Sequence, residues 1–107
     1  MPALLIVDVV EVKDAEKYSQ YRERVPKTLA KAGAVYLARG HDISVFAGDW
    51  NPDRIVVVQF PSMDAARAWF ESDGYAELKK LRESSTRMNM VLVETLPEPT
   101  ASPALGT

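Results

Sequence analysis

Few residues of this chain could do chemistry, and their spacing matches no standard catalytic motif. Among the 107 residues there is one His, His41, which stands beside Asp42, and there is no Cys. His41 could act as a general base oriented by that carboxylate, although a solvent-exposed loop His is the commoner outcome and no Ser or Cys nucleophile accompanies it in a recognisable pattern. A metal site needs three or four ligands, and no H-x-x-H motif or His–carboxylate cluster is present. We therefore expect neither a metal nor a cofactor.

Two charged residues interrupt runs that are otherwise typical of strands. Asp8 stands within ALLIVDVVEV, and Arg39 extends AVYLARG. A partly buried charge needs a partner or a ligand. The two residues could pair with each other or with Arg54 or Glu94, they could face solvent at strand ends, or they could line a pocket. In a pocket, the Arg39 guanidinium would be the natural donor to a carboxylate, enolate or phenolate.

Tyr21 is a candidate because a proline comes soon after it in the same predicted helix. Pro26, about one turn later, removes a backbone donor and clashes with the preceding turn, which predicts a kink or break near Val25. Such a break could open a cavity between this helix and the sheet, and the phenol could orient a ligand there.

Other aromatic residues are weaker candidates, since most of them must pack in the core. Trp69 has the helical spacing of a packing residue, and the corner from Trp50 to Arg54 could be purely structural. Period-two alternation puts Tyr36 and Arg39 on opposite faces of their strand, so both can enter one pocket only if a bulge intervenes. The candidate residues are therefore Tyr21, Arg39, His41 and Asp8 for catalysis and Tyr36, Trp50, Arg54 and Trp69 for ligand binding.

The apolar pattern predicts the elements that position these residues. One helix begins after the N-cap Asp14 and ends at Gly33, and a second begins after Ser62 and is interrupted at Asp73-Gly74. The second and third predicted strands could also form one bent strand. The predicted strands are 3–12, 34–40, 43–48, 54–60 and 88–96.

With residues 34–48 counted as one strand, the order is βαββαβ. This order predicts an α+β, ferredoxin-like fold with an antiparallel sheet and both helices on one face. The first strand, however, is apolar on both faces, and a soluble monomer does not tolerate an exposed apolar sheet face of several hundred Å². We therefore expect a homodimer in which a second copy packs sheet against sheet. The two sets of side chains are Leu4, Ile6 and Val10 on one face and Leu5, Val7 and Val9 on the other.

Composition excludes several classes of partner. The chain carries 13 Lys and Arg against 15 Asp and Glu, a net charge of −2, and its pI near 5.4 argues against binding nucleic acid. The N-terminus has no basic n-region, and its apolar run is too short to span a membrane. The lack of Cys fits the reducing cytoplasm. Residues 1–96 are expected to form one domain, and 97–107 a Pro/Ala/Ser-rich tail that packs on its own or the partner subunit through Leu105.

Several motifs together resemble the DUF1330 family, small proteins of unknown function in the dimeric α+β barrel superfamily. They are VKDAEKYSQYRERVP, AGAVYLARG and GDWNPDRIVVVQFPSMDAARAWFESDGYAELKKLR, within a resemblance that runs from about residue 3 to 96. The resemblance implies the same dimeric ferredoxin-like fold. Two positions depart from the family: Gly33-Ala34 stands where it usually has Gly-Gly, and Ala47 stands where it usually has Glu before Gly48. If that carboxylate serves a shared chemistry, this protein lacks it or supplies it elsewhere.

Two functions remain open at this point. Families near DUF1330 include cofactor-independent monooxygenases, haem-degrading enzymes, isomerases and dehalogenases, so membership alone fixes no reaction. The protein could be an enzyme acting on a small hydrophobic or aromatic molecule by monooxygenase, isomerase or cyclase-like chemistry. It could instead be a non-catalytic dimer that binds a ligand or a protein. A cavity between the sheet and the first helix with converging polar groups of perturbed pKa would favour the enzyme, and a filled apolar core would favour the binder.

Overall fold

The computed structural model describes residues 1–98 of the chain. Its elements follow one another with short connections, except for the long loop between the second and third strands. They are β1 (Ala3–Val12), α1 (Ala15–Lys31), β2 (Val35–Gly40), β3 (Ile55–Phe60), α2 (Met63–Glu71), α3 (Asp73–Ser85) and β4 (Thr86–Glu94). The last strand begins and ends two residues earlier than predicted. Among the described residues, no helix is long and apolar enough to cross a membrane.

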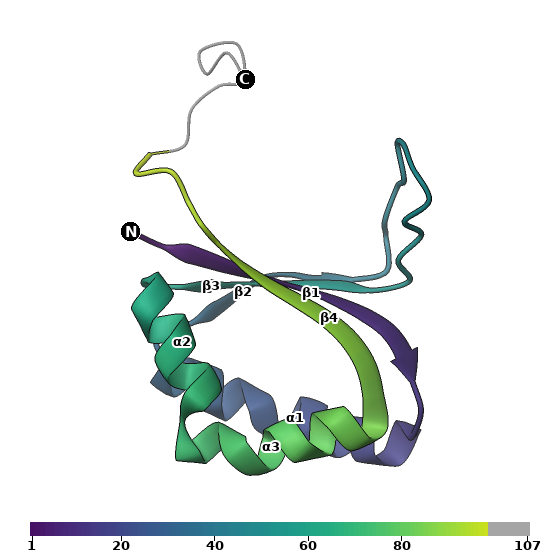
Figure 1. Cartoon of the computed structure of the whole chain (residues 1–107), viewed down its shortest axis with the longest axis horizontal. Helices are drawn as coiled ribbons and strands as arrows, with labels where there is room; N and C mark the ends of the chain where they lie inside the picture. The colour runs from purple at the N-terminus through teal and green to yellow at the C-terminus, as the bar shows by residue number, and fades with distance from the viewer. Residues whose placement is uncertain (99–107) are drawn as a thin grey trace.

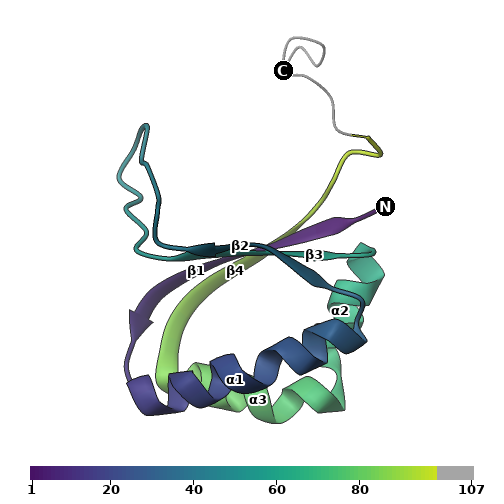
Figure 2. The same cartoon turned by 180° about the vertical axis from the view of Figure 1, so that it is seen from behind.

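The four strands form one antiparallel sheet in the order β2-β3-β1-β4. All three helices lie on the same face of this sheet, and the other face is open (Figure 1 and, from behind, Figure 2). This is the ferredoxin-like α+β fold that the order of elements predicted. A register shift between Val9 and Glu11 marks a bulge where β1 pairs with β4, near the end at which both strands curve towards the helices. A bulge increases local bend and twist.

Capping residues lie at the ends of the helices, as the sequence predicted. The Asp14 side chain accepts a hydrogen bond from the Lys17 backbone N–H at the start of α1. After α1, Gly33 adopts a positive φ of 76°, and a Cβ there would lie 3.0 Å from Cγ of Pro61. The predicted interruption of the second helix is present, but it lies at Ser72, one residue before Asp73-Gly74, and those two residues begin α3.

The predicted break at Pro26 is absent. Helix α1 continues through Pro26 to Lys31 as one helix. Although Pro26 has no N–H to donate, the residues around it keep helical geometry, and the Thr28 hydroxyl donates to the Val25 carbonyl oxygen at 2.8 Å. The loss of one backbone donor is therefore not enough to interrupt a helix that is packed against the sheet.

The predicted strand over residues 43–48 is also absent. Residues 41–54 form a loop that rises from the end of β2 and β3 beyond the open face of the sheet (Figure 1). The run is β-prone, but no strand among the described residues pairs with it, and a strand needs a neighbour to satisfy its backbone. At the base of the loop, Nδ1 of His41 lies 2.9 Å from the carbonyl oxygen of Asp53.

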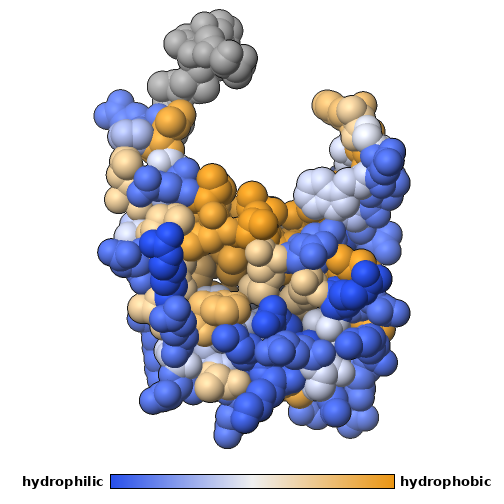
Figure 3. Space-filling view, in the orientation of Figure 1, coloured by the Kyte–Doolittle hydropathy of each residue, from blue (hydrophilic) through white to orange (hydrophobic). Residues whose placement is uncertain are grey.

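The core lies between the sheet and the helices. Leu5, Val7 and Val9 of β1 point into it, whereas Leu4 and Ile6 lie on the open face and are only half-buried. This confirms the alternation expected for β1. Figure 3 shows apolar residues gathered in the hollow on the open side of the sheet. The large apolar residues that are roughly half-exposed on this face are Val35, Leu37, Val91 and Val93.

The C-terminal tail falls almost entirely beyond the described part of the chain. Only Pro97 and Glu98 of the predicted tail 97–107 are described. The expectation that Leu105 anchors it lies outside the described residues.

Candidate functional site

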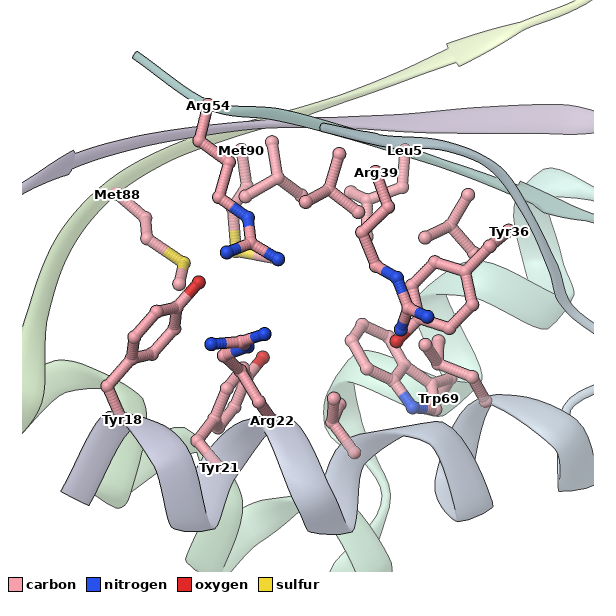
Figure 4. Close-up of a pocket in the computed structure, with 15 residues that line it drawn as sticks. Leu5, Tyr18, Tyr21, Arg22, Tyr36, Arg39, Arg54, Trp69, Met88 and Met90 are labelled. Carbon is pink, nitrogen blue, oxygen red and sulfur yellow. The ribbon is translucent and has the colours of Figure 1, made fainter. Parts of the chain in front are cut away.

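A cavity of about 70 Å³ lies between α1 and the inner face of the sheet (Figure 4). A cavity needs roughly 10–15 Å³ to hold one water, so this one has room for several waters or for part of a small ligand. Apolar residues from β1, β3, β4 and α1 form most of its wall, among them Leu5, Val58 and Met90. Four aromatic residues and three arginines complete the lining. No Asp, Glu or His belongs to it.

Tyr21 lies in this cavity, and its hydroxyl is held by a second phenol. The Tyr21 and Tyr75 hydroxyl oxygens are 2.8 Å apart, and Tyr75 is fully buried. Burial raises the pKa of both phenols, and the neighbouring Tyr75 raises the pKa of Tyr21 further. Both side chains therefore stay protonated at neutral pH. They can donate and accept hydrogen bonds, but Tyr21 does not supply a phenolate base.

Trp69 forms a rigid part of the wall. Its indole N–H donates to the Thr28 hydroxyl at 2.9 Å, and its ring lies 4.2 Å from that of Tyr75, centroid to centroid. The side chain is buried and also lines the cavity. The packing role that its spacing predicted and a role in the cavity are therefore compatible.

A bulge in β2 brings Tyr36 and Arg39 to the same face. Tyr36 pairs with Val58 of β3, but Ala38 already pairs with Val57, so Leu37 is the extra residue. The shift of one residue turns Arg39 towards the cavity, where its guanidinium lies 4.3 Å from the centre of the Tyr36 ring. The bulge that both side chains would need in order to enter one pocket is therefore present, and Tyr36 and Arg39 both line the cavity.

Arg54 and Arg22 complete the group of arginines. Arg54 directly precedes β3, and its Nε is buried without a hydrogen-bond partner among the described residues. It is therefore not tied to backbone carbonyls or to an acid, as a purely structural corner would require. Arg22 comes from α1 and lies 5.6 Å from the centre of the Tyr18 ring. In Figure 4, the guanidinium groups of Arg22 and Arg54 point towards one another across the cavity.

Asp8 and Trp50 lie on the opposite face of the sheet and do not reach the cavity. The Trp50 indole N–H donates to Oδ2 of Asp8 at 2.8 Å, and Asp8 is only 8% exposed beneath the loop that carries Trp50. Ile6, Asn89 and Val91 surround this pair. The suggested ion pair between Asp8 and an arginine is therefore wrong: even-numbered residues of this part of β1 face away from Arg39 and Arg54.

His41 stays outside the cavity as well. It is exposed and lines an open recess beside the cavity mouth, together with Ser19, Glu23 and the three arginines. The imidazole faces the Asp53 carbonyl rather than a carboxylate or a nucleophile. Ala47, where the resembling family usually has Glu, does not line the cavity either.

Among the aromatic and charged residues that line this cavity, sequence reasoning missed two, Tyr18 and Arg22. Both line the cavity, and with Val25 they follow the three- and four-residue steps of the helix face that carries Tyr21. That spacing was the available signal. Among residues 1–98, no group of three or more His, Cys, Asp or Glu residues is placed to hold a metal ion.

Comparison with solved structures supports the fold. A protein of unknown function from Rhodopseudomonas palustris, RPA0582, has 17% identity and a TM-score of 0.75, with 91% of this chain and 84% of that chain covered. SnoaB, a cofactor-independent oxygenase from Streptomyces nogalater, has 12% identity and a TM-score of 0.62, covering 91% and 98%. A dimeric ferredoxin-like protein of unknown function from Jannaschia sp. CCS1 has 13% identity and a TM-score of 0.64, covering 89% and 100%.

The sequence comparison is more specific about ancestry than about chemistry. No curated protein matches the chain. Residues 2–96 match the family described as "Domain of unknown function (DUF1330)". This match takes in every strand and helix of the structure. The chain therefore belongs to the DUF1330 family.

Proposed function

We propose that this protein binds a small hydrophobic or aromatic molecule in the cavity between α1 and the sheet, as ligand or as substrate. The observation that carries the proposal is a cavity with an apolar and aromatic wall into which several polar side chains converge. Binding sites for small molecules have this composition, in which a few polar groups orient a mostly apolar ligand. The small cavity volume favours a ligand with one ring over a larger one.

Binding is better supported than proton abstraction by the protein. No Asp, Glu or His lines the cavity, and the raised pKa of Tyr21 removes the phenolate as a base near neutral pH. Catalysis of the monooxygenase, isomerase or cyclase kind would then depend on a substrate that ionises with the help of the site. The similarity of fold to SnoaB, a cofactor-independent oxygenase, favours oxygenation among these reactions. A non-catalytic ligand-binding or protein-interaction dimer is the alternative.

We also propose that a second copy of the chain covers the open face of the sheet. The half-exposed apolar residues on this face, such as Leu37 and Val91, form the kind of surface that soluble monomers rarely leave uncovered. The similar protein from Jannaschia is described as dimeric. Phe46, which is 97% exposed on the loop that rises beyond this face, would find its contact on the second copy.

The ligand-binding proposal is tested by filling the cavity. Val56 lines the cavity from β3, so Val56→Phe should block it, whereas Ala30→Phe adds the same side chain on the exposed side of α1. We expect a panel of single-ring aromatic compounds, charged and neutral, to contain at least one that raises the melting temperature of the wild type and of Ala30→Phe but not of Val56→Phe. No stabilisation by any compound at millimolar concentration, or equal stabilisation of both variants, would contradict the proposal.

A further inference from the structure

We infer that the molecule bound in this cavity is an organic anion, a small aromatic or short alkyl carboxylate, whose charged oxygens are held by Arg22, Arg39 and Arg54. This inference rests on the proposed ligand-binding function and names the class of ligand. It follows from the charge of the cavity, from one unpartnered donor, and from the distribution of polar and apolar residues along the wall.

The charge of the cavity is unbalanced. Three guanidinium groups line it and no acidic side chain does. Elsewhere the described residues pair surface arginines with acids, as in Arg24 with Glu77 at 3.7 Å, but Arg22, Arg39 and Arg54 have no such ion pair among residues 1–98. Arg22 and Arg39 are exposed and Arg54 is partly buried, and like charges that line one cavity repel one another. An anion between them would turn this repulsion into attraction.

Arg54 adds an independent observation. Its Nε is buried and donates to nothing among the described residues. A buried donor without an acceptor has lost its hydration and gained no bond in return, which is the condition that a ligand oxygen relieves. Guanidinium is the side chain best suited to this task, because two of its N–H groups can bind one carboxylate in parallel.

The three arginines come from separate elements, which makes the cluster a property of the fold. Arg22 projects from α1, Arg39 reaches the cavity only because of the β2 bulge, and Arg54 stands at the start of β3. Figure 4 draws the three side chains towards one shared space. A strand without the bulge would turn Arg39 to the open face, so the irregularity of β2 has a consequence for charge at this site.

The remainder of the wall suits the apolar body of the same molecule. Tyr36 and Trp69 present rings to the cavity, and Leu5 and Met90 present aliphatic and thioether groups. Glu23 and His41 stand outside, in the open recess at the mouth, where water screens the charge of Glu23. The arginines line both spaces, so a carboxylate would lie at the mouth and its ring or chain would point inwards.

The test compares two probes that differ in charge and little in shape, 3-phenylpropionate and 3-phenylpropanamide, by calorimetric titration at pH 7 and low salt. We expect the carboxylate to bind the wild type at least about ten-fold more tightly than the amide, because it adds hydrogen bonds between charged groups. Arg54→Gln and Arg39→Gln should each weaken carboxylate binding about ten-fold and change amide binding little. Arg24→Gln, on the same helix as Arg22 but paired with Glu77, should leave both affinities unchanged.

The outcomes separate the anion site from the ligand-binding function. Equal affinity for the two probes, or carboxylate affinity that survives both Arg39→Gln and Arg54→Gln, would overturn the anion site while leaving the cavity as a binding site for neutral molecules. Failure of both probes to bind would overturn the ligand-binding function and the anion site together. Because Arg39 is exposed, Arg39→Gln still tests the inference if Arg54→Gln does not fold.

Discussion

The Tyr21 and Tyr75 pair shows how a single buried hydrogen bond limits what the cavity can do. Both phenols have a pKa above the ordinary value of 10.0, because burial disfavours the phenolate. In the unfolded chain the same phenols lose their protons near pH 10. At higher pH the unfolded state therefore binds fewer protons than the folded state, and the free energy of unfolding falls as the pH rises.

The variant Tyr21→Phe tests this account through its pH dependence. At pH 7 we expect it to lose about 1–2 kcal/mol of stability, because the Tyr75 hydroxyl loses its partner. Above pH 10 its stability should decline less steeply than that of the wild type, since one phenol of raised pKa has been removed. Urea unfolding between pH 7 and pH 11 measures both effects. An identical decline in the two proteins would contradict the raised pKa of Tyr21.

At this scale the sequence predicted some site residues and misjudged others for identifiable reasons. Tyr21 was placed beside a cavity, but the cavity needs no break at Pro26. The joint entry of Tyr36 and Arg39 depends on one extra residue in β2, which no composition signal marks. For Asp8 an ion pair, a solvent-facing position and a pocket were left open, whereas an indole from a distant loop binds its carboxylate. Long-range contacts of this kind are invisible to local patterns.

At the scale of elements, the turn after α1 depends on Gly33. Its φ of 76° is costly for any residue with a side chain, and a Cβ would also press on the Pro61 ring at 3.0 Å. This turn leads directly into β2, the strand that carries Tyr36 and Arg39. We expect Gly33→Ala to lower the free energy of unfolding by about 1–3 kcal/mol. Chemical denaturation measures this change.

Gly74 provides the matched control. It lies in α3 without a positive φ, and a Cβ added there would meet no atom within 4 Å. Gly74→Ala should therefore be neutral or raise stability by up to about 1 kcal/mol, because alanine favours the helix. Equal effects of the two substitutions would mean that the conformation at Gly33 does not matter.

Local signals predicted helices better than strands. Capping residues and helical spacing are contained within a segment, so Asp14 and Ser62 could be identified as caps from their neighbours. A strand also needs a neighbouring strand to pair with. Residues 43–48 have the composition of a strand, but no strand of the described chain pairs with them. The second predicted strand of this region therefore became part of a loop.

At the scale of the whole molecule, the sequence predicted the fold because order and alternation agreed. The βαββαβ order allows few sheets, and the two-sided apolar pattern of β1 required helices on one face and a further cover on the other. The helices take the inner face, as Leu5 and Val7 indicate. The outer face keeps Val91 59% exposed and Leu37 54% exposed, which is the surface that the proposed second copy would cover.

A charge placed among the exposed apolar residues of this outer face should separate two copies. Val91 lies on β4 beside Asp8 and Trp50, and Val91→Glu would bury an unpaired carboxylate in a sheet-to-sheet interface, weakening association by about a hundred-fold or more. Ala30→Glu, which adds the same charge on the exposed side of α1, should change nothing. Sedimentation is measured at about 10 μM, a concentration at which natural dimers of ordinary affinity persist. It should give a dimer for the wild type and for Ala30→Glu, and a monomer for Val91→Glu. A stable wild-type monomer would refute the interface, since the apolar face would then tolerate water.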